Sequence, residues 1–206
     1  MMKKLFSSLI SLILAGCTVM GVRSSQEPSC QVLSDHGDIQ IRAYPALLVA
    51  ETFMEADYAK AGNIGFKRLA GYIFGGNLQK QSMAMTAPVF REAVGENIAM
   101  TAPVLQQRVD GKWMMAFVMP AGYDLATLPK PLDPEVVLKT MPARKVAVLR
   151  YSGPLNLESI GQNSQRLSEW LERQGLKPLS NPRSAAYDPP WTLPALRRNE
   201  IHIDIA

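Results

Sequence analysis

The sequence is poor in the side chains that most often bind metal ions or act as nucleophiles. Its 206 residues include 2 histidines and 2 cysteines, and aromatic residues make up 7% of the chain. These residues show no spacing typical of a zinc site, and no Ser/His/Asp or Cys/His arrangement is recognisable. We therefore expect neither a metal centre nor a catalytic triad.

The sequence also lacks the surplus of positive charge that would indicate a nucleic-acid partner. The formal net charge is +4, and Lys3 and Lys4 lie in the N-terminal leader described below. Loss of that leader, which contains no acidic residue, would leave a net charge of +2. No basic run and no alternation of basic and aromatic residues remains. We therefore expect that the protein does not bind nucleic acid.

A long apolar run lies near the N-terminus, at residues 5–14. It is too short for a permanent membrane span and follows two lysines, as in a secretory signal. The sequence Leu-Ala-Gly-Cys at residues 14–17 then resembles a lipobox, in which small residues precede the cysteine that receives the lipid. We therefore predict a lipoprotein signal peptide at residues 1–16 and lipidation at Cys17. The alternative is an ordinary signal peptide that happens to contain a cysteine.

The residues after Cys17 predict a tether and the place of anchoring. The segment is rich in serine and other polar residues, so we predict a lipidated tether at residues 17–32 and one folded domain at residues 33–206. Several acyl chains on one cysteine would anchor the domain firmly to a membrane. Thr18 stands where an aspartate would indicate retention in the inner membrane, so we expect the periplasmic face of the outer membrane. Cys30, left alone by lipidation, cannot form an intramolecular disulfide.

The hexapeptide AMTAPV occurs twice, at residues 84–89 and 99–104. Apolar side chains alternate within each copy, which is the two-residue period of a half-buried strand. Pro88 and Pro103 cannot donate a backbone hydrogen bond, so each copy should lie at a sheet edge, a strand end or a bulge. We predict two short strands that are joined through the turn residues 95–97.

Hydrophobic periodicity predicts the other elements. Strands are expected at residues 39–41, 47–52, 113–119, 136–141, 146–151 and 200–205. Amphipathic helices are expected from residue 57 to a stop at residues 75–77, and from residue 157 to near residue 175. The order strand, proline bend, strand, helix, strands occurs twice, and Pro45 precedes its counterpart Pro142 by 97 residues. We therefore predict an α+β domain of two pseudo-repeated halves, with a mainly antiparallel sheet, two principal helices and a groove between the halves.

Several motifs together resemble the SOUL haem-binding protein family. They are Ile-Gln-Ile-Arg-Ala-Tyr-Pro-Ala at 39–46, Tyr-Ile-Phe-Gly-Gly-Asn at 72–77, both Met-Thr-Ala-Pro-Val copies, Phe-Val-Met-Pro at 117–120, Ala-Val-Leu-Arg-Tyr-Ser-Gly at 147–153, Tyr-Asp-Pro-Pro at 187–190 and Arg-Arg-Asn-Glu-Ile at 197–201. The resemblance implies a distorted barrel of two related halves and the binding of haem or another tetrapyrrole. The second hexapeptide then looks like an added strand with an architectural role.

The resemblance also implies a slot beside the first helix and under the loop that follows residues 187–190. Carried over by position, the lining comes from this helix and this loop: Asn63, Phe66, Ala70, Trp191 and Leu193. Arg198, together with Lys67 and Arg68, would face the haem carboxylates.

The two histidines are poor candidates for an iron ligand. His36 lies in a polar stretch that predicts an exposed turn. His202 alternates with the isoleucines of the last strand, so we expect it at the surface or in a hydrogen bond. Haem, which folding would not require, is therefore expected to bind in an apolar groove with little or no axial ligation.

Two alternatives to haem binding remain open. The domain could bind another apolar small molecule or a partner protein in the cell envelope. Less favoured is a hydrolase in which Glu200, near Tyr187, acts as a general base. Glu200 next to Arg197 and Arg198 is more simply an ion-paired structural residue.

Overall fold

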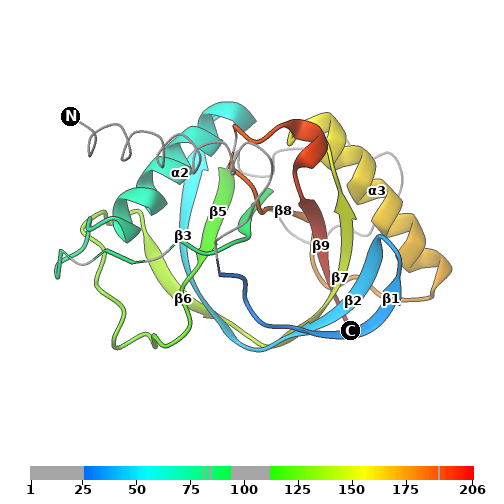
Figure 1. Ribbon diagram of the computed structural model, residues 1–206, viewed down its shortest axis with the longest axis horizontal. Helices are drawn as coiled ribbons and strands as arrows, with labels where there is room; N and C mark the ends of the chain where they lie inside the picture. The colour runs from blue at the N-terminus through cyan, green and yellow to red at the C-terminus, as the bar shows by residue number, and fades with distance from the viewer. Residues whose placement is uncertain (1–25, 81, 84, 94–111, 190) are drawn as a thin grey trace, which may run out of the picture.

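A computed structural model describes residues 26–206, except residues 81, 84, 94–111 and 190. In these residues nine strands form one sheet in the order β1-β2-β7-β9-β8-β4-β5-β3-β6, and each neighbouring pair is antiparallel. The strands are β1 (Gln31–His36), β2 (Ile39–Tyr44), β3 (Leu47–Glu55), β4 (Val89–Ala93), β5 (Lys112–Val118), β6 (Val137–Met141), β7 (Arg144–Tyr151), β8 (Arg183–Ala186) and β9 (Asn199–Ile205). The sheet curls into a half-barrel (Figure 1).

Two helices cover the outer face of this sheet, one on each half (Figure 1). Helix α2 (Tyr58–Ile73) packs on β3 and β5, and helix α3 (Leu157–Arg173) packs on β7 and β9. Each helix begins at a residue whose side chain accepts a hydrogen bond from a backbone N–H of the first turn, Asp57 for α2 and Asn156 for α3. The architecture confirms the predicted α+β distorted barrel with two principal helices.

The inner face of the half-barrel is defined by the strand register. Residues paired directly across strands lie on the same face, and one such row runs through four strands: Glu200, Ala185, Phe90 and Ala116. In β9, Glu200, His202 and Asp204 therefore face inwards. The alternating isoleucines of β9 lie in the core under α3.

In its described residues, 85–89, the first AMTAPV copy does not form the predicted strand. Strand β4 begins only at Val89, the last residue of that copy. Before it, Thr86 makes an isolated bridge with Gln26, and Pro88 has no N–H with which to extend the ladder. The second copy, at residues 99–104, lies outside the described residues, so its predicted strand stays a prediction.

Strand β1 lies where the sequence predicted a tether and a turn. Gln31 and Val32, the last residues of the predicted tether, are its first two residues, and His36 is its last. His36 is exposed, as predicted, but it is the last residue of a strand rather than part of a turn. The turn follows at Gly37, whose φ is +81°. Strand β1 is almost entirely exposed at the sheet edge, so it has no apolar alternation by which to recognise it.

Candidate functional site

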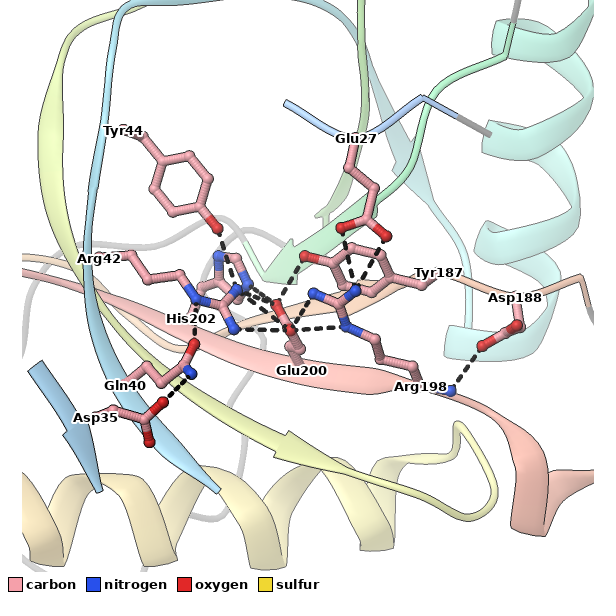
Figure 2. A network of polar contacts seen from close by, with 10 residues as sticks. All are labelled: Glu27, Asp35, Gln40, Arg42, Tyr44, Tyr187, Asp188, Arg198, Glu200 and His202. Atoms are coloured by element: carbon pink, nitrogen blue, oxygen red, sulfur yellow. Dashed lines mark hydrogen bonds and ion pairs between the residues drawn. The ribbon is translucent and has the colours of Figure 1, made fainter. Parts of the chain in front are cut away.

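The buried carboxylate of Glu200 is the centre of a polar network on the inner face. Arg42 on β2 donates through Nη1 to Oε1 and Oε2 at 3.2 and 3.1 Å, and through Nη2 to Oε1 at 3.2 Å. Arg198 donates to Oε1 through Nε at 3.0 Å and through Nη2 at 2.8 Å. Figure 2 shows the two guanidinium groups on either side of Glu200.

The second carboxylate oxygen of Glu200 also accepts hydrogen bonds from neutral groups. The hydroxyl of Tyr187 donates to Oε2 at 2.7 Å, and Nε2 of His202 lies 2.8 Å from the same atom. Because an ionised carboxylate can only accept, Nε2 of His202 carries the proton of this contact. Four side chains thus converge on one carboxylate that is 0% exposed.

The electrostatic environment keeps Glu200 ionised. Burial alone would raise its pKa, but the hydrogen bond from His202 and the charges of Arg42 and Arg198 outweigh burial and hold the pKa well below its usual value. Burial lowers the pKa of His202, so the ring is neutral. Burial also raises the pKa of Tyr187 well above its usual value, which keeps the hydroxyl a donor.

This arrangement favours a structural role for Glu200. Its four approximate lone-pair positions are occupied by Arg42, Arg198, Tyr187 and His202. A general base needs a pKa near the working pH and access to a substrate proton, whereas the pKa of Glu200 is lowered and its side chain is buried. The geometry therefore weighs against a hydrolase that uses Glu200.

The N-terminal segment 26–30, which we call the strap, joins this network from above. Arg198 donates through Nη1 to both carboxylate oxygens of Glu27, at 3.0 and 3.1 Å. The carbonyl of Gln26 accepts from the backbone N–H of Ala87 at 3.0 Å. Figure 2 shows Glu27 above Arg198 and Tyr187.

An open hollow of about 380 Å³ lies at the end of the strap. It is lined by the strap, the start of β1 and the bend between β2 and β3: Ser29, Cys30, Gln31, Ala43, Tyr44 and Pro45. Tyr44 connects this hollow with the polar network, because its hydroxyl accepts from Nη1 of Arg42 at 3.3 Å. None of the predicted binding residues lines this hollow.

The predicted helix residues lie on the outer side of the molecule. Asn63 is exposed, Ala70 is half-buried and Phe66 is 42% exposed. The ring of Phe66 meets Phe117 edge to face, with 5.7 Å between centroids. Phe117 follows Ala116 in β5, so it points to the face opposite the inner row.

The predicted loop residues lie in a loop that is hydrogen-bonded to Arg197 and Arg198. Trp191 is 62% and Leu193 is 53% exposed. Their loop is joined to the start of β9, because Asp188 accepts from the backbone N–H of Arg198 at 2.6 Å and the carbonyl of Thr192 accepts from Arg197 at 2.7 Å. The guanidinium of Arg198, however, turns to the inner face. Phe66 and this guanidinium therefore approach the sheet from opposite faces.

The other predicted carboxylate partners differ in their surroundings. Lys67 is exposed. Arg68 donates to the carbonyl of Phe53 at 3.1 Å and lies 3.9 and 3.6 Å from the carboxylates of Asp133 and Glu135. Arg68 thus already has anionic partners within the chain.

The histidines differ sharply in environment. The ring of exposed His36 packs against Trp170, with 5.1 Å between centroids. His202 is 1% exposed, so the predicted surface position is wrong and the predicted hydrogen bond is correct. Within the described ranges no group of three or more His, Cys, Asp or Glu side chains could hold a metal ion.

Sequence reasoning did not identify Arg42, Tyr44 or Glu27 as members of the network. Alternation in β2 places Arg42 and Tyr44 opposite the apolar Ile39 and Ile41, which is a usable signal for a polar inner face. Arg42 reaches Glu200 because β2, β7 and β9 follow one another in the sheet. No local sequence pattern predicts this strand order.

Solved structures share this fold at low sequence identity. The C-terminal domain of EcmrR superposes with a TM-score of 0.60 at 14% identity and covers 82% of this chain and 96% of that domain. An uncharacterised conserved protein from Listeria innocua gives a TM-score of 0.59 at 10% identity, covering 82% and 92%. A hydrolase from Listeria innocua gives 0.52 at 9% identity, covering 84% and 94%. These likenesses show the fold alone.

The sequence itself matches one family model. No curated protein matches the chain. The family model described as SOUL heme-binding protein matches residues 25–204, which spans both halves of the barrel and the strap. The chain therefore belongs to the SOUL haem-binding protein family.

Proposed function

We propose that this protein binds haem or a related tetrapyrrole by apolar contact, without an axial histidine, as a lipid-anchored protein of the cell envelope. The observation that carries the proposal is the family match over residues 25–204. A haem is a flat apolar plate with two carboxylates, so an apolar, partly aromatic surface is the first requirement for binding it.

Exposed aromatic residues support the apolar contact. Phe66 and Trp191 leave 42% and 62% of their surface exposed. Asn63 and Ala70 lie three residues before and four residues after Phe66, so the three share one face of α2. Leu193, 53% exposed, extends the apolar surface of the loop beside Trp191. A tetrapyrrole ring would cover apolar surface that now faces water.

The surroundings of His202 support binding without that residue as a ligand. Its Nε2 atom is engaged by Glu200 at 2.8 Å, and its side chain is buried beneath the network. Iron ligation through this nitrogen would leave the buried carboxylate without one of its donors, which is costly.

A haemin titration tests the binding proposal. The full chain is reconstituted in lipid nanodiscs, with empty nanodiscs as the blank, and absorbance is followed in the Soret region. We expect saturable one-to-one binding that weakens roughly tenfold in Phe66→Ala or Trp191→Ala, because an aromatic contact adds about 0.5–1.5 kcal/mol to its area term. Phe53→Ala, at a 37% exposed ring on β3 whose cross-strand partner Met114 belongs to the inner-face cluster, is the matched control.

Other results of this titration decide between the alternatives. Unsaturable binding, equal in all variants, would refute a tetrapyrrole site and favour another apolar ligand or a partner protein. Loss of the Soret shift in His202→Gln, with the fold intact, would refute binding without an axial histidine.

The envelope location is proposed from the lipobox at residues 14–17, which lies outside the described residues. No helix in the described part of the chain is both long and apolar enough to cross a membrane. Metabolic labelling with a palmitate analogue should label the wild-type chain and fail to label Cys17→Ser. Labelling of both chains, or recovery of the wild-type chain from the aqueous fraction, would refute the proposed lipid anchor.

A further inference from the structure

The two guanidinium groups of the network are not neutralised by Glu200 alone. Arg42 and Arg198 carry two positive charges and share one buried carboxylate, Glu200. Glu27 supplies the second negative charge from the strap. Arg198 therefore holds one carboxylate from the core of the sheet and one from a segment 171 residues away in the sequence.

The contact with Glu27 belongs to a segment that precedes the first strand of the sheet. Ladder pairing of the N-terminal region begins at Gln31. Among the described residues, contacts of the strap before Gln31 include the parallel bridge of Gln26 with Thr86, to which the Ala87 hydrogen bond belongs, and the ion pair of Glu27. The side chain of Glu27 is 37% exposed, whereas that of Arg198 is 17% exposed. An ion pair in which one partner is this exposed to water contributes little stability.

The surface beside the strap suits a ligand with an apolar body. Ala87, which bonds to the strap, belongs to a buried apolar cluster with Phe90 and Tyr187 on the inner face. The Tyr187 ring lies directly under the guanidinium of Arg198, 3.9 Å from its centroid. The open hollow of about 380 Å³ adjoins the other end of the strap. A displaced strap would thus uncover a cation beside an apolar wall.

We propose that Arg198 is a binding site for the carboxylate of an amphipathic small molecule, and that Glu27 occupies this site in the unliganded chain. The ligand carboxylate replaces that of Glu27 and accepts hydrogen bonds from Nη1 of Arg198 through both oxygens. The apolar body of the ligand lies along Ala87 and Tyr187. Arg42 and Glu200 keep their mutual pair, so the core of the network does not change. This site lies on the face of the sheet opposite Phe66, so it is separate from the Phe66 surface of the proposed function. It does not require haem to be the ligand, since a haem propionate and a fatty acid carry the same group.

The test compares acids with their esters on the full chain in nanodiscs, in the wild type and in Glu27→Gln. The probes are haemin with haemin dimethyl ester, read from the Soret band, and cis-parinaric acid with its methyl ester, read by fluorescence. Removal of the internal competitor should strengthen binding of the acid about tenfold more than binding of the ester, because both gain access to the apolar wall but only the acid forms a charge-assisted pair with Arg198. Glu55→Gln, which breaks the exposed pair of Glu55 with Lys112 at 2.9 Å, is the matched control.

Strap displacement is measured separately by hydrogen exchange at the Ala87 amide. Exchange should be faster in Glu27→Gln and in the presence of the bound acid, and unchanged in Glu55→Gln. A gain confined to haemin or to parinaric acid identifies the source of the carboxylate. If Glu27→Gln changes acid and ester alike, or changes neither pair, the carboxylate site is refuted, whether or not haemin binds. If haemin does not bind but binding of parinaric acid is strengthened in Glu27→Gln, the haem proposal is refuted and the carboxylate site is supported.

Discussion

Arg42 and Glu200 are 158 residues apart in the sequence, yet their side chains meet at 3.1 Å inside the half-barrel. Their strands, β2 and β9, are not neighbours, because β7 lies between them. The ion pair therefore crosses an intervening strand of the inner face and ties the first strands of the domain to the last. Both side chains are buried, with 8% and 0% exposure.

Glu200→Ala should strongly destabilise the fold. The substitution leaves the guanidinium groups of Arg42 and Arg198 without their shared buried anion, and breaking a buried pair typically costs about 3–5 kcal/mol. Urea unfolding followed by circular dichroism measures the change. Glu55→Gln, at the exposed pair with Lys112, should cost less than about 1 kcal/mol. Equal effects of the two substitutions would contradict a structural role for the network.

The fold was largely predictable because its buried elements carry clear apolar periods. Both helices and the strands under them have a covered face, so their patterns survive in the sequence. Strand β1 was not predicted because it is exposed at the sheet edge and has no apolar period. Strand β8 was not predicted because it is only four residues long, Arg183–Ala186, and two of them are small alanines. The first AMTAPV copy misled the interpretation, since its alternation precedes the strand that begins at Val89.

The candidate site was less predictable because it depends on strand order. Glu200 and Tyr187 are 13 residues apart in the sequence, and the hydrolase hypothesis had already placed them together. Arg42 reaches Glu200 only through the pairing of β2 with β7 and of β7 with β9. Glu27 reaches Arg198 from a segment whose polar composition predicts a tether. Non-local contacts of this kind leave no periodic signal.

Two glycines of the first half should respond oppositely to alanine. Gly71 lies inside α2, and an added Cβ there would meet no atom within 4 Å. Gly71→Ala should therefore stabilise the protein by about 0.5–1 kcal/mol, the usual difference in helix propensity. A Cβ on Gly76 would lie 2.6 Å from the carbonyl oxygen of Gly71, which is backbone and cannot move aside. Gly76→Ala should destabilise, and thermal unfolding measures both changes. Stabilisation by Gly76→Ala would show that this turn packs differently.

His202 should make folding stability depend on pH in a defined direction. Burial lowers its pKa from the usual value of 6.5, so in the folded state the ring stays neutral at pH values where the unfolded chain is protonated. Because the unfolded state then binds more protons, the contribution of the neutral His202 ring to the free energy of unfolding is complete above about pH 6.5. It decreases as the pH is lowered from there. His202→Gln keeps an N–H that can donate to Glu200 but cannot titrate, so the slope between about pH 7 and about pH 5.5 should flatten. Urea unfolding at successive pH values measures this slope. His36→Gln, made at the exposed histidine, controls for loss of a histidine and should retain it. A slope unchanged in His202→Gln would contradict a neutral buried ring at His202.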